Sequence, residues 1–285
     1  MIAILSDIHG NLHALEAVLA DMPKISAIWV LGDFAGGLPF PCEVIDRILN
    51  LSVPVTAVLG NWEEMLIDSR HGRHPEYWER KQFGTMAWTV EALKPHHWTY
   101  LENLGETQVM GEVTGRALLY HGMPEDSFGQ IKNQEPAEKT AAGHTEKWLL
   151  GGHYHKTRLY RVGEKRVVVN GSVGISMDKI GGTACYALLD DENITFRHVA
   201  YDLDAALSAF KASELFERGP YFSRAVAAAM ITGRDYANGY NGLFPFVESY
   251  VKERLGQLPK VIPAELWDEA AEAWRVEDWL EEKLK

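Results

Sequence analysis

Short apolar runs alternate with amphipathic segments through the first half of the chain. The runs are Ile2–Leu5, Ala27–Leu31, Val55–Leu59 and Ala117–Tyr120. Unbroken apolar runs of this length are typical of strands buried on both faces of a sheet. Between the first two runs, apolar residues recur at three- and four-residue steps, as on one side of a helix. Between the second and third runs, Pro41 stands where the first turn of a helix tolerates proline. The pattern predicts a βαβαβ beginning.

The middle of the chain predicts an insertion and then a second sheet. Residues from Glu76 to Asn103 are rich in Trp and Tyr and predict helices that break at Pro95, within an insertion at about residues 62–104. After Trp148, Gly-containing turns separate further short strands. These strands are Arg158–Val162, Arg166–Asn170, Thr183–Leu189 and Ile194–Val199. They indicate an antiparallel or mixed second sheet, so the expected fold is α/β, with two packed sheets flanked by helices.

Helical periodicity replaces the strand signal beyond residue 202. The expected helices are Leu203–Phe216, Phe222–Ile231, Phe244–Leu255 and Ala264–Leu284. We therefore divide the chain into a main domain, residues 1–202, and a C-terminal helical extension, residues 203–285. Trp267, Ala270 and Trp274 share one helical stripe, which favours packing against the main domain. A contact between copies of the chain in a homo-oligomer and a lid over a site are the alternatives.

Composition narrows the classes of protein that the chain can represent. With 46% apolar and 24% charged residues among 285, it resembles ordinary soluble globular proteins. Its net charge of −12 counts against the broad basic face that nucleic acid or an anionic membrane requires. No stretch approaches the ~20 apolar residues of a membrane span, and Met1–Leu5 lacks the features of a secretory signal. Cys42 and Cys185 have no CxxC partners, which argues against a disulfide framework and indicates the reducing cytoplasm.

The chemistry of the chain concentrates where its apolar runs end. Five of these ends carry side chains that can bind metal ions, namely Asp7, His9, Asp33, Asn61, His121, His153 and His155. Ligands of open α/β sheets gather at the carboxyl edge of the strands, so we expect these side chains to lie together although they are far apart in the sequence. The sequence therefore predicts a metal centre.

The donor set narrows the choice of metal. Two carboxylates, one amide and four imidazoles, with no thiolate, suit manganese, iron, cobalt, nickel or zinc better than calcium or a structural zinc. Seven ligands exceed the needs of one ion. Two divalent ions ~3.5–4 Å apart, sharing a carboxylate and a bridging water, are the expected arrangement, and such pairs serve hydrolysis.

Five motifs in this order resemble those of the calcineurin-like metallophosphoesterases. They are Asp7-Ile-His9, Gly32-Asp33-Phe-Ala-Gly36, Gly60-Asn61, His121-Gly122 and Gly152-His153-Tyr-His155, and the resemblance covers about residues 1–200. It implies an αββα sandwich and hydrolysis of phosphate esters by a metal-bridging hydroxide. Among the possible metals, manganese is favoured.

The resemblance also assigns roles to the candidate ligands. It implies that Asp7, His9 and His155 hold a first metal ion and that Asn61, His121 and His153 hold a second. Asp33 would bridge both ions. Asp33, Asn61 and His121 are the residues expected to take part in catalysis.

Trp62 marks a departure from the family pattern. Many members carry a histidine after the metal-binding asparagine, and that histidine can protonate the leaving group, whereas an indole cannot act as a general acid. Good leaving groups are then preferred, which favours phosphoanhydrides or activated phosphodiesters of nucleotide type. The Gly60–Glu63 run also resembles bacterial diadenosine tetraphosphate hydrolases. Trp62 either stacks on a base or packs inside the protein.

Other interpretations stay open at this point. A scaffold that kept the fold for protein binding and lost hydrolysis is one alternative, against which the complete ligand set argues. A nuclease of the same family is another, which the acidic net charge disfavours. The expected partner is a small phosphorylated substrate. Residues Asn170 to Gly174 are interpreted as a tight turn between strands rather than as direct support of the site.

Overall fold

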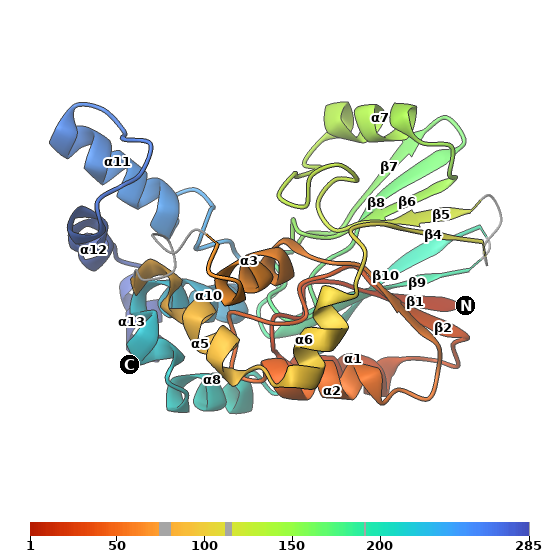
Figure 1. Ribbon diagram of the computed structural model, residues 1–285, viewed down its shortest axis with the longest axis horizontal. Coiled ribbons are helices and arrows are strands. Elements are labelled where there is room, and N and C mark those ends of the chain that lie inside the picture. Colours follow the sequence, from red (N-terminus) through yellow and green to blue (C-terminus); the bar gives the residue numbers. More distant parts are fainter. Residues whose placement is uncertain (74–80, 112–115, 191, 285) are drawn as a thin grey trace.

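Two mixed β-sheets pack face to face between outer helices (Figure 1). The computed structural model describes residues 1–73, 81–111, 116–190 and 192–284. The first sheet has the strand order β10-β9-β1-β2-β3, and the second has the order β4-β5-β6-β8-β7. The predicted αββα sandwich is therefore confirmed.

The elements follow one another along the chain in this way. The strands are β1 (Ile2–Leu5), β2 (Ala27–Val30), β3 (Val55–Ala57), β4 (Gln108–Met110), β5 (Ala117–Leu119), β6 (Trp148–Gly151), β7 (Arg158–Val162), β8 (Lys165–Val169), β9 (Thr183–Leu189) and β10 (Ile194–Ala200). The helices of the main body are α1 (Leu12–Asp21), α2 (Pro41–Leu49), α3 (Asn61–Arg70), the 3₁₀ turn η1 (Lys81–Phe83), α5 (Gly84–Ala92), α6 (Pro95–Glu102) and α7 (Gln134–Gly143). The C-terminal helices are α8 (Leu203–Ala212), α9 (Leu215–Arg218), α10 (Pro220–Thr232), α11 (Leu243–Leu255), α12 (Ala264–Ala273) and α13 (Asp278–Leu284).

The pairing of the strands confirms the start of the chain and corrects its continuation. β1, β2 and β3 pair in parallel, as the predicted βαβαβ unit requires. The expectation that all four strands between residues 158 and 200 form a second sheet is wrong, because β9 and β10 join the first sheet, where β9 runs antiparallel to β1. Strand spacing reports which segments are extended but carries no information about their partners.

Alternating burial explains the unbroken apolar runs. Along β1, Ile2 and Ile4 point into the layer between the sheets, whereas Ala3 and Leu5 pack beneath α1 and α2. The same rule holds on the second sheet, where Leu149 lies under α7 and its neighbour Leu150 lies between the sheets. Since both faces of these strands are covered, both must be apolar.

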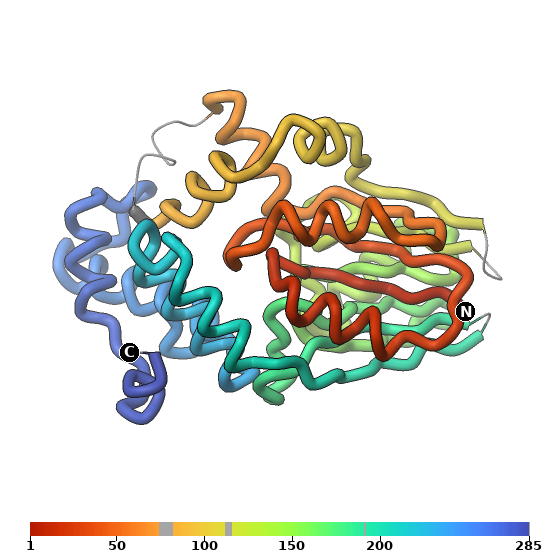
Figure 2. The backbone as a smooth tube through the Cα atoms, turned by 90° about the horizontal axis from the view of Figure 1, so that it is seen from below, coloured from red at the N-terminus to blue at the C-terminus, as the bar shows by residue number. Residues whose placement is uncertain are grey.

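The C-terminal helices pack together at one end of the sandwich, beside the insertion helices (Figure 2). The stripe of Trp267, Ala270 and Trp274 is buried in this helical core. One continuous helix over Ala264–Leu284 was expected, which is wrong: α12 gives way to extended backbone at Trp274, whose indole N–H donates to the Asn241 carbonyl at 3.0 Å. The domain division at residue 202 stays a prediction.

The sequence pattern does not predict every element of the fold. Helix α7 and the short strand β4 carry weak apolar periodicity and were missed, and the predicted helical segment from Glu76 lies outside the described residues as far as residue 80. No helix in the described part of the chain is long and apolar enough to cross a bilayer.

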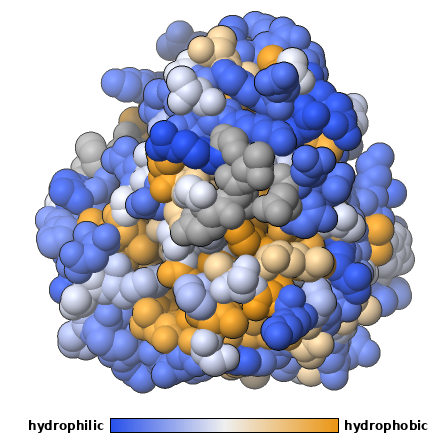
Figure 3. Space-filling view, turned by 90° about the vertical axis from the view of Figure 1, so that its right-hand side faces the viewer, coloured by the Kyte–Doolittle hydropathy of each residue, from blue (hydrophilic) through white to orange (hydrophobic). Residues whose placement is uncertain are grey.

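At the end of the sandwich where β1 begins, apolar residues gather in the middle of the face, and hydrophilic residues surround them (Figure 3).

Candidate metal centre

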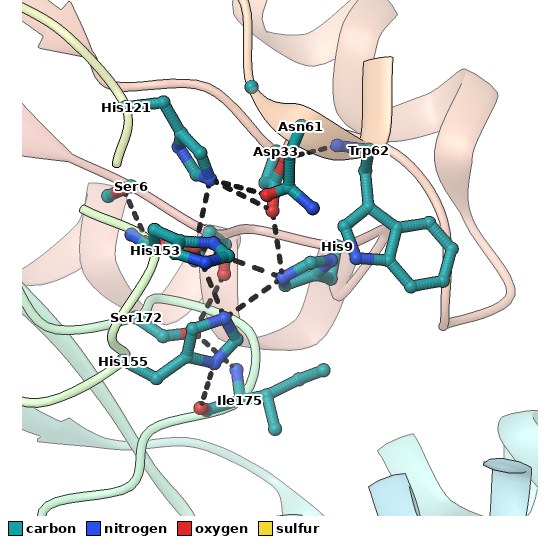
Figure 4. A network of polar contacts seen from close by, with 12 residues as sticks. Ser6, His9, Asp33, Asn61, Trp62, His121, His153, His155, Ser172 and Ile175 are labelled. Atoms are coloured by element: carbon teal, nitrogen blue, oxygen red, sulfur yellow. Dashed lines mark hydrogen bonds and ion pairs between the residues drawn. The ribbon is translucent and has the colours of Figure 1, made fainter. Parts of the chain in front are cut away.

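The predicted ligands meet at the carboxyl ends of the parallel strands of both sheets (Figure 4). Asp7 follows β1, Asp33 follows β2, and Asn61 opens α3 after β3. His121 follows β5, while His153 and His155 follow β6. Six of the seven side chains are buried, and His153 is partly exposed. The face-to-face packing of the sheets thus brings together residues that lie up to 148 positions apart in the sequence.

The backbone around this site is strained. Asp7, His9, Asp33, His153 and His155 adopt φ values between 53° and 64°. This left-handed region disfavours residues with a Cβ, and such strain concentrates at functional sites, where the surrounding structure holds it in place. At these positions the chain keeps a side chain that can bind a metal where glycine would be the easier choice.

The ligand atoms form two groups. In the first, His155 Nε2 lies 3.2 Å from Asp7 Oδ1 and 3.2 Å from His9 Nε2. In the second, the ligand atoms of Asp33, His121 and His153 lie within 4.8 Å of one another, and His121 Nε2 is 2.9 Å from Asn61 Oδ1. Each group has the size of a single-ion site.

Asp33 joins the two groups. Its Oδ2 atom lies 3.5 Å from His9 Nε2 in the first group and 3.3 Å from His121 Nε2 in the second. Its Oδ1 atom accepts a hydrogen bond from the backbone N–H of Trp62 at 2.9 Å, which fixes the orientation of the carboxylate. One carboxylate oxygen is therefore shared between the groups.

Backbone carbonyls set the tautomers of two imidazoles. His121 Nδ1 donates to the Leu31 carbonyl at 2.6 Å, and His155 Nδ1 donates to the Ile175 carbonyl at 2.8 Å. In the neutral ring the proton then sits on Nδ1, so the Nε2 lone pair points into the site. At His121 this lone pair faces the oxygen of Asn61, and the two would repel unless a positive charge lay between them.

Charge and burial are consistent with cation binding. Asp7 Oδ2 accepts hydrogen bonds from Ser6 and from the His153 backbone, whereas its buried Oδ1 has no hydrogen-bond donor among the described residues and faces the imidazoles. Burial alone raises the pKa of Asp7, but the neighbouring imidazoles, His155 first, lower it well below its usual range. Burial lowers the pKa of His9 to about 4 and, with the nearby His121, that of His153 to about 4.

His121 shows the opposite shift. Burial lowers its pKa, but the Asp33 and Asp7 carboxylates and the Leu31 carbonyl outweigh burial and raise it to about 10. Two buried carboxylates thus demand positive charge, which either protons or metal ions can supply. The donor set and its geometry fit two divalent ions.

Glu63 supports the site and was missed by the sequence analysis. Its buried carboxylate accepts hydrogen bonds from the backbone N–H groups of Asp33, Phe34, Ala35 and Gly60, at 2.7, 2.9, 3.2 and 3.1 Å. Two bonds go to each oxygen, so the carboxylate clamps the loop that carries Asp33 onto the start of α3. A glutamate three residues after Gly60, the residue before a helix, is a capping signal that could have identified it.

Residues Asn170 to Gly174 support the first group of ligands directly. The Ser172 hydroxyl donates to the Asp7 carbonyl at 2.7 Å, and the backbone N–H of Gly174 donates to the same oxygen at 2.9 Å. The expected tight turn between strands is wrong, because this segment crosses from β8 in the second sheet toward β9 in the first. The crossing places it under the strained Asp7 loop.

Two further clusters could be mistaken for metal sites. Asp46, His96 and His97 lie together, but His97 Nδ1 accepts the Lys94 backbone N–H at 3.1 Å, so Nε2 carries the proton and donates to Asp46. The second cluster is Asp178, Cys185 and His198, in which burial raises the pKa of the Cys185 thiol. Neither cluster offers a complete set of free lone pairs.

Comparison with known proteins agrees with the geometry of the site. Residues 1–193 match the calcineurin-like phosphoesterase superfamily domain. The crystal structure of a metallophosphoesterase from Sphaerobacter thermophilus shares 26% identity and a TM-score of 0.66, over 80% of this chain and 99% of that one. A hypothetical protein from Pyrococcus horikoshii OT3 shares the fold, with a TM-score of 0.70 and 24% identity over 82% of this chain and 99% of that one.

A curated relative extends the comparison. An uncharacterized protein of Methanocaldococcus jannaschii is 26% identical over 227 residues, which are 72% of this chain and 90% of the relative. Together with the sandwich fold and the two adjoining ligand groups, the domain match establishes the family. The chain belongs to the calcineurin-like phosphoesterase superfamily.

Proposed function

We propose that the chain is a two-metal hydrolase of phosphodiester or phosphoanhydride bonds in nucleotide-type substrates. Asp7, His9 and His155 would hold one divalent ion, and Asn61, His121 and His153 the other, with manganese favoured for both. The observation that carries the proposal is the position of Asp33 Oδ2, 3.5 Å from His9 Nε2 and 3.3 Å from His121 Nε2. A carboxylate oxygen in that position suits a ligand shared by two ions.

The protein's own groups prepare the site for phosphate. Two bound divalent ions supply Lewis-acid activation of water and of the phosphoryl group. The buried carboxylates of Asp7 and Asp33 provide the negative charge that holds them. Carbonyls at Leu31 and Ile175 keep the imidazole lone pairs directed inward, so the ligands need little rearrangement.

Trp62 restricts the leaving group. Its indole ring lies beside His9, with ring centroids 5.6 Å apart, at the position where many family members carry a proton-donating histidine. Indole carries no transferable proton at neutral pH, so a leaving oxygen of low basicity is favoured. Phosphoanhydrides and aryl or activated diesters satisfy this condition.

Local charge argues against a nuclease. A cavity of about 230 Å³ lies beside His121. Its lining includes four acidic residues, Glu64, Glu106, Glu125 and Asp126. An extended nucleic-acid backbone passing the site on this side would meet four carboxylates, which repel it. A small substrate with one reacting phosphate group avoids them.

The test is a leaving-group series assayed with Mn²⁺. An aryl phosphodiester, an aryl monoester, diadenosine tetraphosphate and glycerol phosphate are compared, with Asp33→Asn as the inactive reference. The expected result is metal-dependent turnover of the diester and of the dinucleotide, and slow turnover of glycerol phosphate. Equal rates on glycerol phosphate and on the aryl diester would refute the leaving-group argument. Bound metal without turnover on any ester would favour the scaffold.

A further inference from the structure

A larger cavity extends from the candidate metal centre toward the C-terminal helices. A cavity of about 500 Å³ has Asp33, Asn61 and His153 in its lining at one end. The far end is formed by α10, α11 and the loop between them, which belong to the C-terminal helices. This volume falls in the range of pockets that bury small organic ligands. It is larger than a phosphate group alone requires.

The wall of this cavity is aromatic. The Trp62 ring lies 5.8 Å from that of Phe222 at a tilt of 32°, and Phe222 lies 6.2 Å from Phe244 at 40°. The three rings lead from the His9 edge of the metal centre toward α11. We call this part of the cavity the aromatic pocket, and its lining also includes Met65, Met86 and Val226.

The residues around the pocket restrain the Trp62 ring and leave space beside Phe222. Gly36 packs so closely on the six-membered ring of Trp62 that an added Cβ would lie 2.2 Å from Cε3. On α10, Ala225 and Ala229 line the cavity with small side chains beside Phe222. A ring held in this way offers a preformed flat face, on which a planar group can stack at low entropic cost.

Polar groups occupy both ends of the pocket. Asp235 and Asn238, from the loop between α10 and α11, line the far end, where they can meet the polar edge of a heterocycle. Lys132 lines the same cavity, and its ammonium lies 5.8 Å from the centroid of the Tyr154 ring, which stands between His153 and His155 in the sequence. The cavity therefore offers a positive charge for a phosphate and hydrogen-bonding groups for a heterocycle.

We infer that the aromatic pocket binds the nucleobase of the substrate while its phosphate lies at the metal centre. This inference rests on the proposed function and narrows the substrate class to nucleoside phosphates with a free base. The C-terminal helices then form part of the substrate site. Trp62 then has both of the roles considered for it, packing and base stacking. Its ring packs against Gly36 and also lines the cavity.

The experiment measures binding and turnover separately. Equilibrium dialysis of adenosine against the chelator-treated full chain reports the pocket without metal or catalysis. Phe222→Leu keeps an apolar side chain but removes the ring, and it is expected to weaken adenosine binding roughly ten-fold, as loss of one base-stacking contact does. Tyr240→Ala is the matched control, since that ring is 98% exposed on the same loop region and does not line the cavity.

Turnover gives the second arm. With Mn²⁺, ATP is expected to show a KM about ten-fold or more below that of tripolyphosphate, and Phe222→Leu is expected to remove that difference. Equal KM values in the parent chain, or adenosine binding that Phe222→Leu leaves unchanged, would overturn the inference and leave the hydrolase proposal standing. Adenosine binding that depends on Phe222, without turnover of any phosphate compound, would refute the hydrolase and keep the base pocket.

Discussion

The Glu63 carboxylate accepts a hydrogen bond from the Asp33 backbone N–H at 2.7 Å, and its three other bonds also go to backbone N–H groups. In Glu63→Gln an NH₂ group must face two N–H donors, which leaves buried donors unsatisfied at a cost of about 1–3 kcal/mol. We expect a lower thermal midpoint and weaker Mn²⁺ binding, because the Asp33 loop loses its clamp.

Glu64→Gln provides the control for this prediction. Glu64 is the next residue on the same helix, and its carboxylate accepts the Ser127 hydroxyl at 2.9 Å, a bond that an amide oxygen can also accept. Calorimetric unfolding measures the thermal midpoint of both variants, and manganese titration measures their affinity for Mn²⁺. Wild-type metal affinity in Glu63→Gln would show that Asp33 does not depend on this clamp.

The shared position of Asp33 predicts how metal content changes on mutation. Asp33→Asn removes the charge that lies between both ligand groups, so we expect it to reduce the bound metal from about two ions per chain to less than one. His155→Ala should lose chiefly one ion, because His155 belongs to the first group only. Elemental analysis after gel filtration measures the content. Ala in place of the exposed His71 should retain both ions, and equal losses in the two site variants would contradict the shared ligand.

Alanine variants of two adjacent glycines distinguish the effect of backbone strain from the effect of contact with Trp62. Gly36 and Gly37 have φ values of +89° and +90°, but a Cβ on Gly36 would meet the indole at 2.2 Å, whereas a Cβ on Gly37 would meet nothing within 4 Å. Both alanine variants should lose stability through the same left-handed strain, roughly 1–2 kcal/mol. Gly36→Ala should weaken adenosine binding more than Gly37→Ala, because it displaces the Trp62 ring, whereas Gly37→Ala only adds a methyl group to the cavity lining. Parallel urea unfolding and dialysis measure both effects, and equal adenosine affinity in the two variants would argue against a rigid pocket.

His97 predicts a pH dependence of stability that is independent of the metal centre. Burial lowers its pKa, partly offset by the hydrogen bond to Asp46, and the exposed His96 and Lys94 nearby lower it further. Unfolded imidazole takes up a proton near pH 6.5, so between that pH and the lower folded value the unfolded state binds more protons. The contribution of His97 is therefore complete above pH 6.5 and decreases as the pH falls through this window.

His97→Gln should reduce this slope, because glutamine does not titrate. Urea midpoints between pH 5 and pH 7.5, measured with a chelator present, compare the variant with wild type and with His71→Gln. The carboxyl group of Asp46 titrates below this range, since its hydrogen bonds to His96 and His97 lower its pKa. An unchanged slope in His97→Gln would exclude His97 as a source of acid sensitivity.

Local sequence was sufficient to locate most of the strands and the candidate ligands that follow them. Side chains of β1 alternate between two buried layers, so the whole run is apolar, and the first polar residues after it mark the end of the strand. Asp7 and Asp33, which follow β1 and β2, can therefore be located from the sequence alone. The order of polar strand ends along the chain was enough to predict one common edge.

Only the tertiary structure decided which strands are neighbours and which side chains surround the ligands. β9 belongs to the first sheet because the segment from Asn170 to Gly174 crosses between the sheets. The periodicity of apolar residues shows that a segment is a strand, but it does not show which strand lies beside it. The local sequence identifies Glu63 only as a helix-capping residue and Phe222 only as one of many apolar residues in a helix. Their roles come from contacts with Asp33 and Trp62 across long stretches of chain, and the packing of whole elements determines those contacts.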